Sequence, residues 1–287
     1  MSRADSASAN DKTLQLHDGR TLGYAEYGIA EGKALFYFHG HPGARLEARF
    51  LAEQAAQAGI RLIGIDRPGM GLSRFKAGRR LLDWPDDVVE LADSLHIDRF
   101  AVVGFSGGGP YALACAYKIP HRLRACGIIA GVGHTSHFLS FLSMWLPWLL
   151  IPIARRFFRD EEHARKSLMW AARSWVEPDK KSLLFPETSE LMAASLVEAL
   201  RQGTRGPAYD GILIGGGRPW GFKLEDIAFP TLYLWHGEQD KDVPIAIGRA
   251  VAERLARCKA TYYPGEGHIS LIVNHREEIV RALQRSP

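Results

Sequence analysis

Short apolar runs alternate with helix-like stretches from residue 34 onward. The apolar runs cover residues 34–38, 61–65, 100–105, 125–130, 231–235 and 260–263. Runs that are apolar on both faces are typical of strands buried in a parallel sheet. Helix-like patterns cover residues 46–58, 83–95, 109–118, 245–257 and 276–284. The alternation predicts an α/β fold with a mostly parallel sheet flanked by helices.

Two local signals refine this prediction. Asp83 is a candidate N-cap, and Asp86 three residues later gives a start that resembles a capping box. Upstream, two short apolar segments flank Asp18-Gly19, a dipeptide that favours a tight hairpin turn. We therefore expect a hairpin that adds antiparallel strands at one edge of the sheet.

The alternation stops between about residues 135 and 225. This stretch combines helix-like apolar spacing with scattered prolines, and it holds five of the seven tryptophans: Trp145, Trp148, Trp170, Trp175 and Trp220. It is typical of a helical insertion between two strands. We therefore expect a core made of residues 1–134 and 226–287, with residues 135–225 inserted as a helical cap.

One segment of the insertion, residues 138–151 (FLSFLSMWLPWLLI), is strongly apolar. It is shorter than the roughly 20 residues that a membrane-spanning helix needs, and Pro147 interrupts it. We predict instead that Met144, Trp145 and Trp148 line a pocket for an apolar group. Packing of these residues against the core is an equally favoured alternative.

Composition and charge narrow the function classes. The chain has 287 residues, of which 46% are hydrophobic and 24% charged, the balance of a globular protein. The formal charge is 36 − 32 = +4, and no Lys/Arg cluster of the nucleic-acid-binding type is present. No nucleic-acid partner is therefore expected. Contact with a lipid surface is a less favoured alternative, because basic residues adjoin the apolar segment.

The cysteines and the N-terminus indicate the compartment. The three cysteines are widely spaced, and no Cys-x-x-Cys or Cys/His cluster is present, so neither a disulfide framework nor a zinc site is indicated. The first twelve residues are polar and lack the apolar core of a signal peptide. We therefore expect a cytoplasmic protein that uses no metal and no cofactor.

Gly104-Phe105-Ser106-Gly107-Gly108 matches the pattern Gly-x-Ser-x-Gly. The bare pattern is weak, but an apolar run precedes Ser106 and a small-residue helix pattern follows it, which is the context of a nucleophile elbow. We predict that Ser106 is a nucleophile and that the backbone N–H of Gly107 faces a developing oxyanion. The alternative is a tight glycine turn with an incidental serine.

His39-Gly40-His41-Pro42-Gly43 directly follows the first apolar run. An oxyanion hole needs a second N–H donor from a neighbouring strand end. Pro42 has no N–H, so the backbone of His41 is the predicted donor. His39 is predicted to be a structural hydrogen-bonding residue. The alternative is a glycine/proline turn without chemistry.

A serine nucleophile needs a base, and the base needs an orienting carboxylate. Asp240 and Asp242 follow the apolar run 231–235, and His268 follows the last run on a glycine-rich loop. Asp242 precedes a Val-Pro pair and suits a turn or a helix cap, so Asp240 is the favoured partner of His268. Two further histidines are predicted to be structural: His236 and His275.

Taken together, these segments resemble the α/β-hydrolase family over nearly everything outside the insertion. The resemblance rests on HGHPGA, DRPGMGLS, GFSGGGPYALACA, HGEQDKDVP and GEGH. It implies an α/β-hydrolase fold with an inserted helical cap. It also implies that Ser106 is the nucleophile, His268 the base and Asp240 its partner, with N–H donors from His41 and Gly107.

The resemblance also limits the roles of nearby residues. The DRPGMGLS segment is usually a structural turn in such folds, so Asp66 and Arg67 are not expected to be catalytic. Epoxide hydrolases and haloalkane dehalogenases use a carboxylate nucleophile, which a serine at position 106 disfavours.

The expected reaction is therefore hydrolysis of a small-molecule carboxylic ester, thioester or lactone through an acyl-enzyme. The substrate is expected to carry an apolar acyl or alcohol portion. A peptidase similar to proline iminopeptidases is an alternative, for which Glu177 is a distant hint. The same motifs also fit a binding or scaffold protein with vestigial hydrolysis, and a lyase or cofactor-free oxygenase that uses the same triad.

Overall fold

An eight-stranded sheet forms the centre of the computed structural model, which describes residues 10–133, 153, 155–215 and 218–286. The strands lie in the order β1-β2-β4-β3-β5-β6-β7-β8. Their bounds are Asp11–Gln15 (β1), Thr21–Gly28 (β2), Lys33–Phe38 (β3), Ile60–Ile65 (β4), Phe100–Phe105 (β5), Leu123–Ile129 (β6), Leu232–Gly237 (β7) and Cys258–Tyr263 (β8). β2 pairs antiparallel with β1 and β4, and all other neighbours are parallel. The predicted fold class and the edge hairpin are confirmed.

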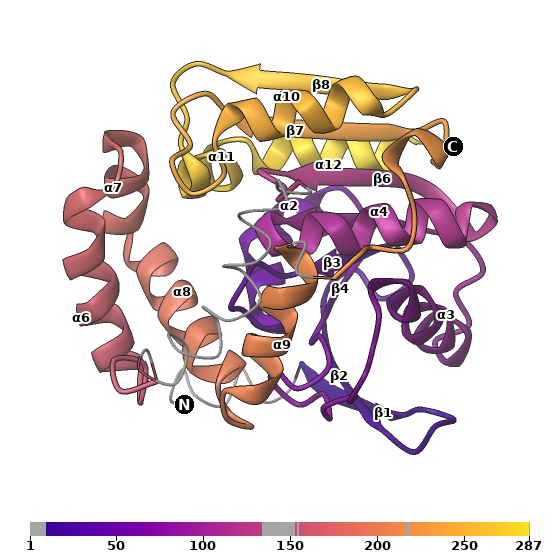
Figure 1. The fold of residues 1–287 in the computed structure, drawn as a ribbon, viewed down its shortest axis with the longest axis horizontal. Helices are drawn as coiled ribbons and strands as arrows, with labels where there is room; N and C mark the ends of the chain where they lie inside the picture. The colour runs from indigo at the N-terminus through magenta and orange to yellow at the C-terminus, as the bar shows by residue number, and fades with distance from the viewer. Residues whose placement is uncertain (1–9, 134–152, 154, 216–217, 287) are drawn as a thin grey trace.

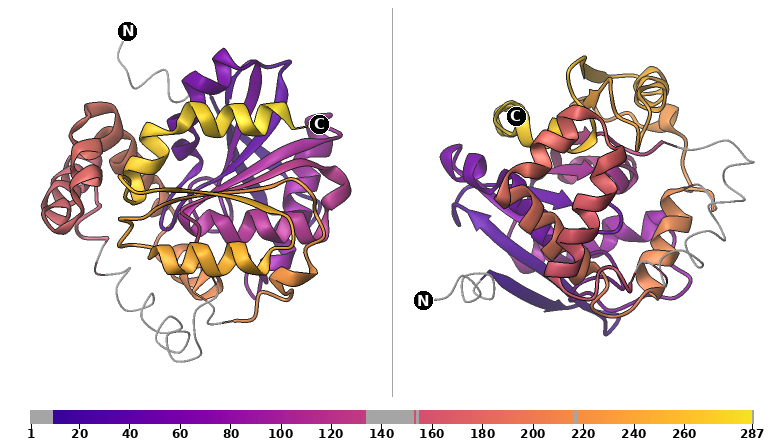
Figure 2. Two further views of the ribbon diagram at one scale, coloured as in Figure 1. Left: turned by 90° about the horizontal axis from the view of Figure 1, so that it is seen from above. Right: turned by 90° about the vertical axis from the view of Figure 1, so that its left-hand side faces the viewer.

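Helices connect these strands (Figure 1). The α-helices of the core are Ala52–Gln57 (α2), Trp84–Ser94 (α3), Gly109–Lys118 (α4), Ile245–Arg254 (α10), His268–Asn274 (α11) and Arg276–Arg285 (α12). Helices α3, α4 and α10 cover one face of the sheet, and α2 and α12 cover the other (Figure 2). The core therefore consists of two apolar layers, one on each face of a sheet whose central strands are buried on both sides.

Two predicted helices differ in detail from those observed. The stretch 46–58 begins as a 3-10 helix, Arg45–Leu51 (η1), and only then continues as α2. The backbone N–H of Arg45 donates a hydrogen bond to the Asp66 carboxylate at 2.6 Å. The backbone N–H of Glu47 donates to the carbonyl of Ala44, three residues earlier, at 3.0 Å. These bonds keep the first turn tight. Asp83 is the N-cap of α3, but its side chain bonds backward to Arg80 and makes no cap hydrogen bond.

In the described part of the segment between β6 and β7, four α-helices are inserted: Glu161–Ala171 (α6), Glu177–Leu184 (α7), Pro186–Ala199 (α8) and Arg205–Ile214 (α9). Figure 1 shows α6, α7 and α8 beyond the carboxyl ends of the parallel strands. The predicted pocket residues Met144, Trp145 and Trp148 lie outside the described residues. Within the described part of the chain, no helix is long and apolar enough to cross a membrane.

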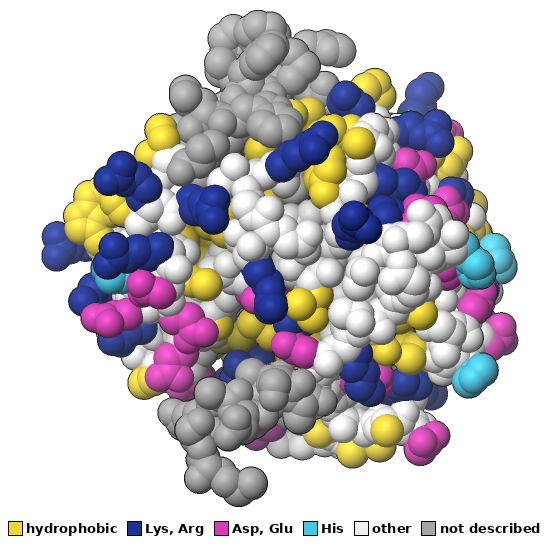
Figure 3. Space-filling view, turned by 90° about the horizontal axis from the view of Figure 1, so that it is seen from below, with side chains coloured by type: hydrophobic (Ala, Val, Ile, Leu, Met, Phe, Trp, Pro, Cys, Tyr) yellow, Lys and Arg dark blue, Asp and Glu magenta, His cyan; other side chains and the backbone are white. Residues whose placement is uncertain are grey.

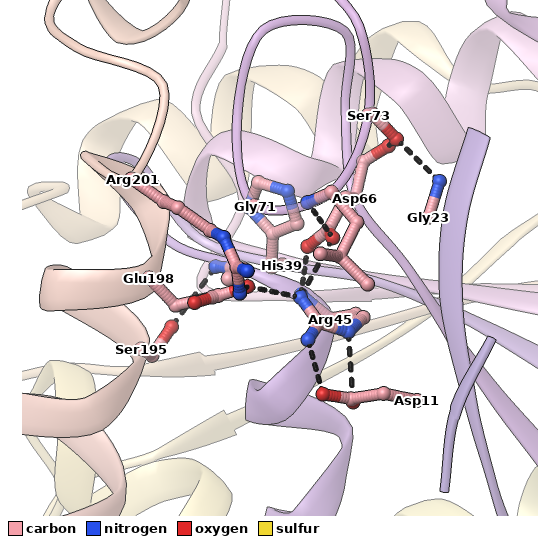
Figure 4. Close-up of polar contacts among 12 residues, drawn as sticks. Asp11, Gly23, His39, Arg45, Asp66, Gly71, Ser73, Ser195, Glu198 and Arg201 are labelled. Atoms are coloured by element: carbon pink, nitrogen blue, oxygen red, sulfur yellow. Dashed lines mark hydrogen bonds and ion pairs between the residues drawn. The ribbon is translucent and has the colours of Figure 1, made fainter. Parts of the chain in front are cut away.

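A buried arginine connects α8 to the core (Figure 4). Arg45 is 1% exposed and pairs with Asp11 at 2.5 Å, with Asp66 at 2.9 Å and with Glu198 of α8 at 2.6 Å. Burial alone disfavours the guanidinium, but the charge of Asp66 and the bonds to Asp11 and Glu198 raise the pKa of Arg45 above its ordinary value. Separating one member of this buried cluster from the others would leave an uncompensated buried charge, which is strongly unfavourable. The cluster therefore holds η1, which carries Arg45, against α8, which carries Glu198.

Candidate functional site

The turn after β5 holds Ser106 in an uncommon conformation. Ser106 has a φ of 49°, in the left-handed region that non-glycine residues rarely adopt. The two glycines of the Gly-x-Ser-x-Gly pattern allow this turn to be tight. A Cβ on Gly104 would lie 2.2 Å from the Gly108 carbonyl oxygen, and a Cβ on Gly108 would lie 2.1 Å from the Phe38 carbonyl oxygen. The strand β5, the serine with its positive φ and the following helix α4 form a sharp strand-to-helix turn, which is the geometry that a nucleophile elbow requires.

The loop after β3 lies directly beside this turn. Phe38 is in register with Gly104 in the parallel pair of β3 and β5. A Cβ on Gly107 would lie 2.7 Å from the Cβ of His41 and 3.3 Å from its backbone nitrogen. The backbones of His41 and Gly107, the two predicted N–H donors, are thus adjacent.

Asp240 follows strand β7, His268 follows strand β8, and the two side chains contact each other. The His268 Nδ1–H donates to the Asp240 Oδ2 at 2.7 Å, which leaves the other ring nitrogen to act as a base. The Asp240 Oδ1 accepts the backbone N–H groups of Asp242 at 2.9 Å and Val243 at 2.8 Å. Burial by itself disfavours the imidazolium, but the hydrogen bond and charge of Asp240 raise the pKa of His268 above its ordinary value.

A cavity of about 350 Å³ brings these groups together. His41, Ser106, Gly107 and His268 all line it, as does Asp242, whereas Asp240 lies behind His268. The inserted segment supplies the apolar wall through Leu168, Trp175, Met192, Leu196 and Ile214. The cavity therefore combines the polar groups at the strand ends with apolar side chains from the insertion and from the core, where Phe105, Val132 and Ile269 also line it.

Glu47 also lines the cavity, although its sequence context does not predict a place at the site. Its Oε2 accepts the Gly40 N–H at 2.6 Å, and its Oε1 accepts the Ser195 hydroxyl of α8 at 3.2 Å. Burial raises the pKa of Glu47 to about 7, even though the Gly40 N–H and the charge of Arg67 act in the opposite direction. Glu47 is thus a titratable group that links the His39–Gly43 loop to α8.

Asp210 of α9 also contacts the same loop. Its fully buried carboxylate accepts the His41 Nδ1–H at 3.1 Å and pairs with Arg67 at 2.8 Å and Arg79 at 2.7 Å. Tyr111 of α4 donates its hydroxyl to the same carboxylate at 2.5 Å. Burial would raise the pKa of Asp210, but the charge of Arg67 and the bond from His41 hold it well below its ordinary value.

The histidines predicted to be structural make structural contacts. The His39 Nε2 accepts the Arg67 N–H at 3.1 Å, so its Nδ1–H donates to the Gly40 carbonyl at 2.8 Å. The His236 ring donates from Nε2 to the Val243 carbonyl at 2.7 Å. His275 lies between α11 and α12, where its Nε2 contacts a carboxylate oxygen of Glu266 at 3.1 Å.

Three acidic residues around the site are not predicted by the sequence pattern: Glu47, Asp179 and Asp210. All three are buried and held by long-range contacts. Each lies in a helical stretch whose pattern gives no sign that its carboxylate is buried. Within the described residues, no group of three or more His, Cys, Asp or Glu could hold a metal ion.

The surface of the insertion carries exposed apolar side chains. Six of them lie in residues 153–185: Ile153, Phe157, Met169, Trp170, Leu184 and Phe185. On the face shown in Figure 3, Lys and Arg side chains are dispersed among acidic and hydrophobic ones and form no continuous basic track. Contact with a lipid surface stays a prediction from the sequence.

Comparisons with known proteins identify the fold family. The model of the alpha/beta hydrolase fold family matches residues 33–275. A 2-hydroxy-6-oxononadienedioate/2-hydroxy-6-oxononatrienedioate hydrolase of Paraburkholderia phymatum is 26% identical over 281 residues, which cover 91% of this chain and 90% of the relative. The bifunctional esterase/perhydrolase DCH of Acinetobacter calcoaceticus is 24% identical over 267 residues, which cover 88% of this chain and 90% of the relative.

A solved structure has the same fold. The enol-lactonase from Burkholderia xenovorans LB400 superposes with a TM-score of 0.73 at 19% identity, covering 96% of this chain and 100% of that chain. The family model spans most of the sequence and includes the segments that carry Ser106, Asp240 and His268. The chain therefore belongs to the α/β hydrolase fold family.

Proposed function

We propose that this hydrolase is a serine hydrolase that cleaves a carboxylic ester, or a related thioester or lactone, through an acyl-enzyme. One observation carries the proposal: Ser106, on its strained turn, and His268, which is hydrogen-bonded to Asp240, line the same cavity. A nucleophile on a sharp turn, with an oriented base at the same cavity, suits acyl transfer. Helices α6 to α9 act as a cap over the core.

In the proposed mechanism, the His268 Nε2 takes the proton of the Ser106 hydroxyl while the serine oxygen bonds to the ester carbonyl carbon. The backbone N–H groups of His41 and Gly107 donate to the resulting oxyanion. The tetrahedral intermediate then breaks its bond to the alcohol oxygen, which takes the proton from His268. Asp240 stabilises the imidazolium throughout this step.

Water completes the cycle. His268 takes a proton from the water as its oxygen bonds to the acyl carbon, and the second tetrahedral intermediate breaks its bond to Ser106. The proton returns to the serine oxygen, and the carboxylic acid leaves. This step needs no co-reactant other than water.

The apolar wall of the cavity indicates the substrate class. Leu168, Met192 and Leu196 face the same space as Ser106. Burying an apolar group against such side chains contributes about 25 cal/mol per Å² of area removed from water. We therefore propose that the substrate carries an apolar acyl or alcohol portion.

The first experiment is labelling with a fluorophosphonate probe. The wild-type protein is expected to be labelled, and Ser106→Ala is expected to lose all labelling. Ser94→Ala, which changes an exposed serine at the end of α3, is the matched control and keeps wild-type labelling. Labelling that persists in Ser106→Ala would contradict the assignment of the nucleophile.

A substrate panel then separates the candidate reactions. Nitrophenyl esters, thioesters and lactones test acyl transfer, and a 2-hydroxy-6-oxodienedioate tests the reaction for which one relative is named. A burst of nitrophenol at the concentration of enzyme is expected for an acyl-enzyme. The absence of any burst or turnover would favour a binding protein on this fold.

The peptidase alternative needs acidic groups of the insertion at the cavity to hold a free amino group. The Glu177 side chain is 67% exposed and contacts Lys180, and it is not among the described residues that line the cavity. Proline nitroanilide belongs in the panel for this reason. Hydrolysis of the esters but not of the anilide is the expected result.

A further inference from the structure

The carboxylate of Asp179 binds the first three backbone N–H groups of α11, the helix that begins with His268. Its Oδ2 accepts the N–H of His268 at 2.9 Å, and its Oδ1 accepts those of Ile269 at 2.9 Å and Ser270 at 2.8 Å. Asp179 lies in the inserted helix α7, is 5% exposed, and is 89 residues away from His268 along the chain. A residue of the insertion therefore caps the helix that carries the proposed base.

This cap replaces one that the local sequence does not supply. The first N–H groups of a helix have no partners within it, and a side chain at the N-cap usually satisfies them. Here the N-cap is Gly267, which has no side chain to offer. A Cβ on Gly267 would lie 2.3 Å from the Asp179 Oδ2, so the glycine also leaves the space that the carboxylate occupies.

The charge of Asp179 acts on His268 as well. A negative group at a helix N-terminus is stabilised by the helix dipole. Burial lowers the pKa of His268, whereas Asp240, Asp242 and Asp179 raise it. Among the described residues, the other titratable groups that face His268 are Glu47 of η1 and His236 at the end of β7.

We propose that Asp179 is a positioning residue, which fixes the backbone of His268 from the insertion so that the base is in place only when α7 is seated on the core. This inference rests on the proposed role of His268 as the base. The insertion then has two roles: it lines the cavity, and it positions the base for the chemical step. The contact also ties the geometry of the base to the position of α7.

Two variants separate geometry from charge. Asp179→Ala removes all three hydrogen bonds and is expected to lower kcat by about 10- to 100-fold, because a catalytic group misplaced by about 1 Å costs on the order of 100-fold. KM for a short ester is expected to change much less. Asp179→Asn keeps one acceptor oxygen for Ile269 and Ser270, so it is expected to retain more of kcat than the alanine variant.

Glu187→Gln is the matched control, because Glu187 is an exposed acidic residue on the adjacent inserted helix α8. It removes one negative charge from the insertion and is expected to keep the wild-type kcat and KM. Thermal melts followed by circular dichroism give the folded fraction of each variant, and all rates are measured well below the transitions.

Titration of the His268 ring by NMR tests the contact without using turnover. The pKa of His268 is expected to fall in both Asp179 variants, because a negative charge that stabilises the imidazolium is lost, and to stay unchanged in Glu187→Gln. The acid limb of kcat/KM is expected to move to lower pH with it. A merely structural role for Asp179 would leave both the pKa and the pH profile of the folded enzyme unchanged.

Failure of the inference and failure of the proposed function give different results. Unchanged kcat and an unchanged His268 pKa in both Asp179 variants would overturn the inference, as would a loss of activity that the unfolded fraction explains completely. If the wild-type protein neither reacts with the fluorophosphonate nor hydrolyses any ester, the proposed function fails. The NMR titration then still decides whether Asp179 raises the pKa of His268.

Discussion

The Asp210 carboxylate of the inserted helix α9 accepts a hydrogen bond from the His41 ring at 3.1 Å. The backbone of His41 lies beside Gly107, so this contact fixes one of the two proposed oxyanion donors from outside the core. The same carboxylate faces two buried guanidinium groups, those of Arg67 and Arg79. The insertion and the loop after β3 therefore share one buried charge cluster.

Removing Asp210 should destabilise the whole protein. Asp210→Ala leaves Arg67 and Arg79 buried without their counter-charge, and breaking buried pairs of this kind costs about 3–5 kcal/mol. Tyr111→Phe removes only a hydroxyl from the same cluster and should cost about 1 kcal/mol. Urea unfolding of both variants measures the difference. Equal free energies of unfolding for the two would show that the cluster contributes little through its charges.

The pKa of His268 sets the acid limb of activity. The base must be neutral to take the Ser106 proton, and its pKa lies above the ordinary value because of Asp240. Activity should therefore fall as pH drops through a pKa higher than the ordinary histidine value of 6.5. A profile of kcat/KM against pH with a nitrophenyl ester measures this pKa, and a limb below 6.5 would contradict the expectation.

Asp240→Asn tests the partner of His268. The amide neither stabilises the imidazolium nor holds the right tautomer, so kcat should fall on the order of 10⁴-fold. Asp242→Asn is the comparison, because Asp242 lines the cavity while the structure pairs His268 with Asp240. If Asp242→Asn loses far more activity than Asp240→Asn, the assignment of the acid is wrong.

Glu47 should make stability depend on pH. Its pKa is about 7 in the folded protein and near 4.5 when unfolded, so the unfolded state releases this proton first as pH rises. The free energy of unfolding should then fall between these two values, by roughly 3 kcal/mol in all, and stay level above them. Glu47→Gln keeps the shape of the side chain but has no proton to release, so this fall should be absent.

Urea unfolding at about pH 5 and about pH 8 measures this effect as the difference between Glu47→Gln and wild type. Contributions from the remaining titrating groups cancel in that difference. Glu53→Gln, at an exposed position of α2, is the control and should follow the wild type at both pH values. Parallel behaviour of wild type and Glu47→Gln would show that the proton on Glu47 does not differ between the folded and unfolded states.

The apolar wall should set the preferred chain length. Leu196→Trp fills part of the cavity and should lower kcat/KM for long acyl esters much more than for acetate. Leu196→Ala enlarges the same part of the cavity and should shift the preference toward longer chains. Chain-length profiles with nitrophenyl esters measure both effects. A profile that neither change alters would place the acyl group elsewhere.

The local sequence pattern predicts the strands and most of the core helices. It predicts helix α4 over its full observed length, because a strand, a glycine turn and an alanine-rich stretch are all local features. It does not predict helix α11, and it places His268 on a glycine-rich loop instead. The reason is physical: Gly267 offers no N-cap, and Asp179 supplies the cap from 89 residues away.

The chain by itself determined which residues reach the edge of the sheet, because His41, Ser106, Asp240 and His268 each follow an apolar run that forms a parallel strand. Strand position and tight glycine turns depend on near neighbours in sequence, so they can be predicted from the pattern. Only the tertiary structure decided the wall of the cavity and the burial of the acidic residues that surround it: Glu47, Asp179 and Asp210. Burial and long-range hydrogen bonds arise when distant segments pack, as α7, α8 and α9 do against the strand ends, and no local pattern records them.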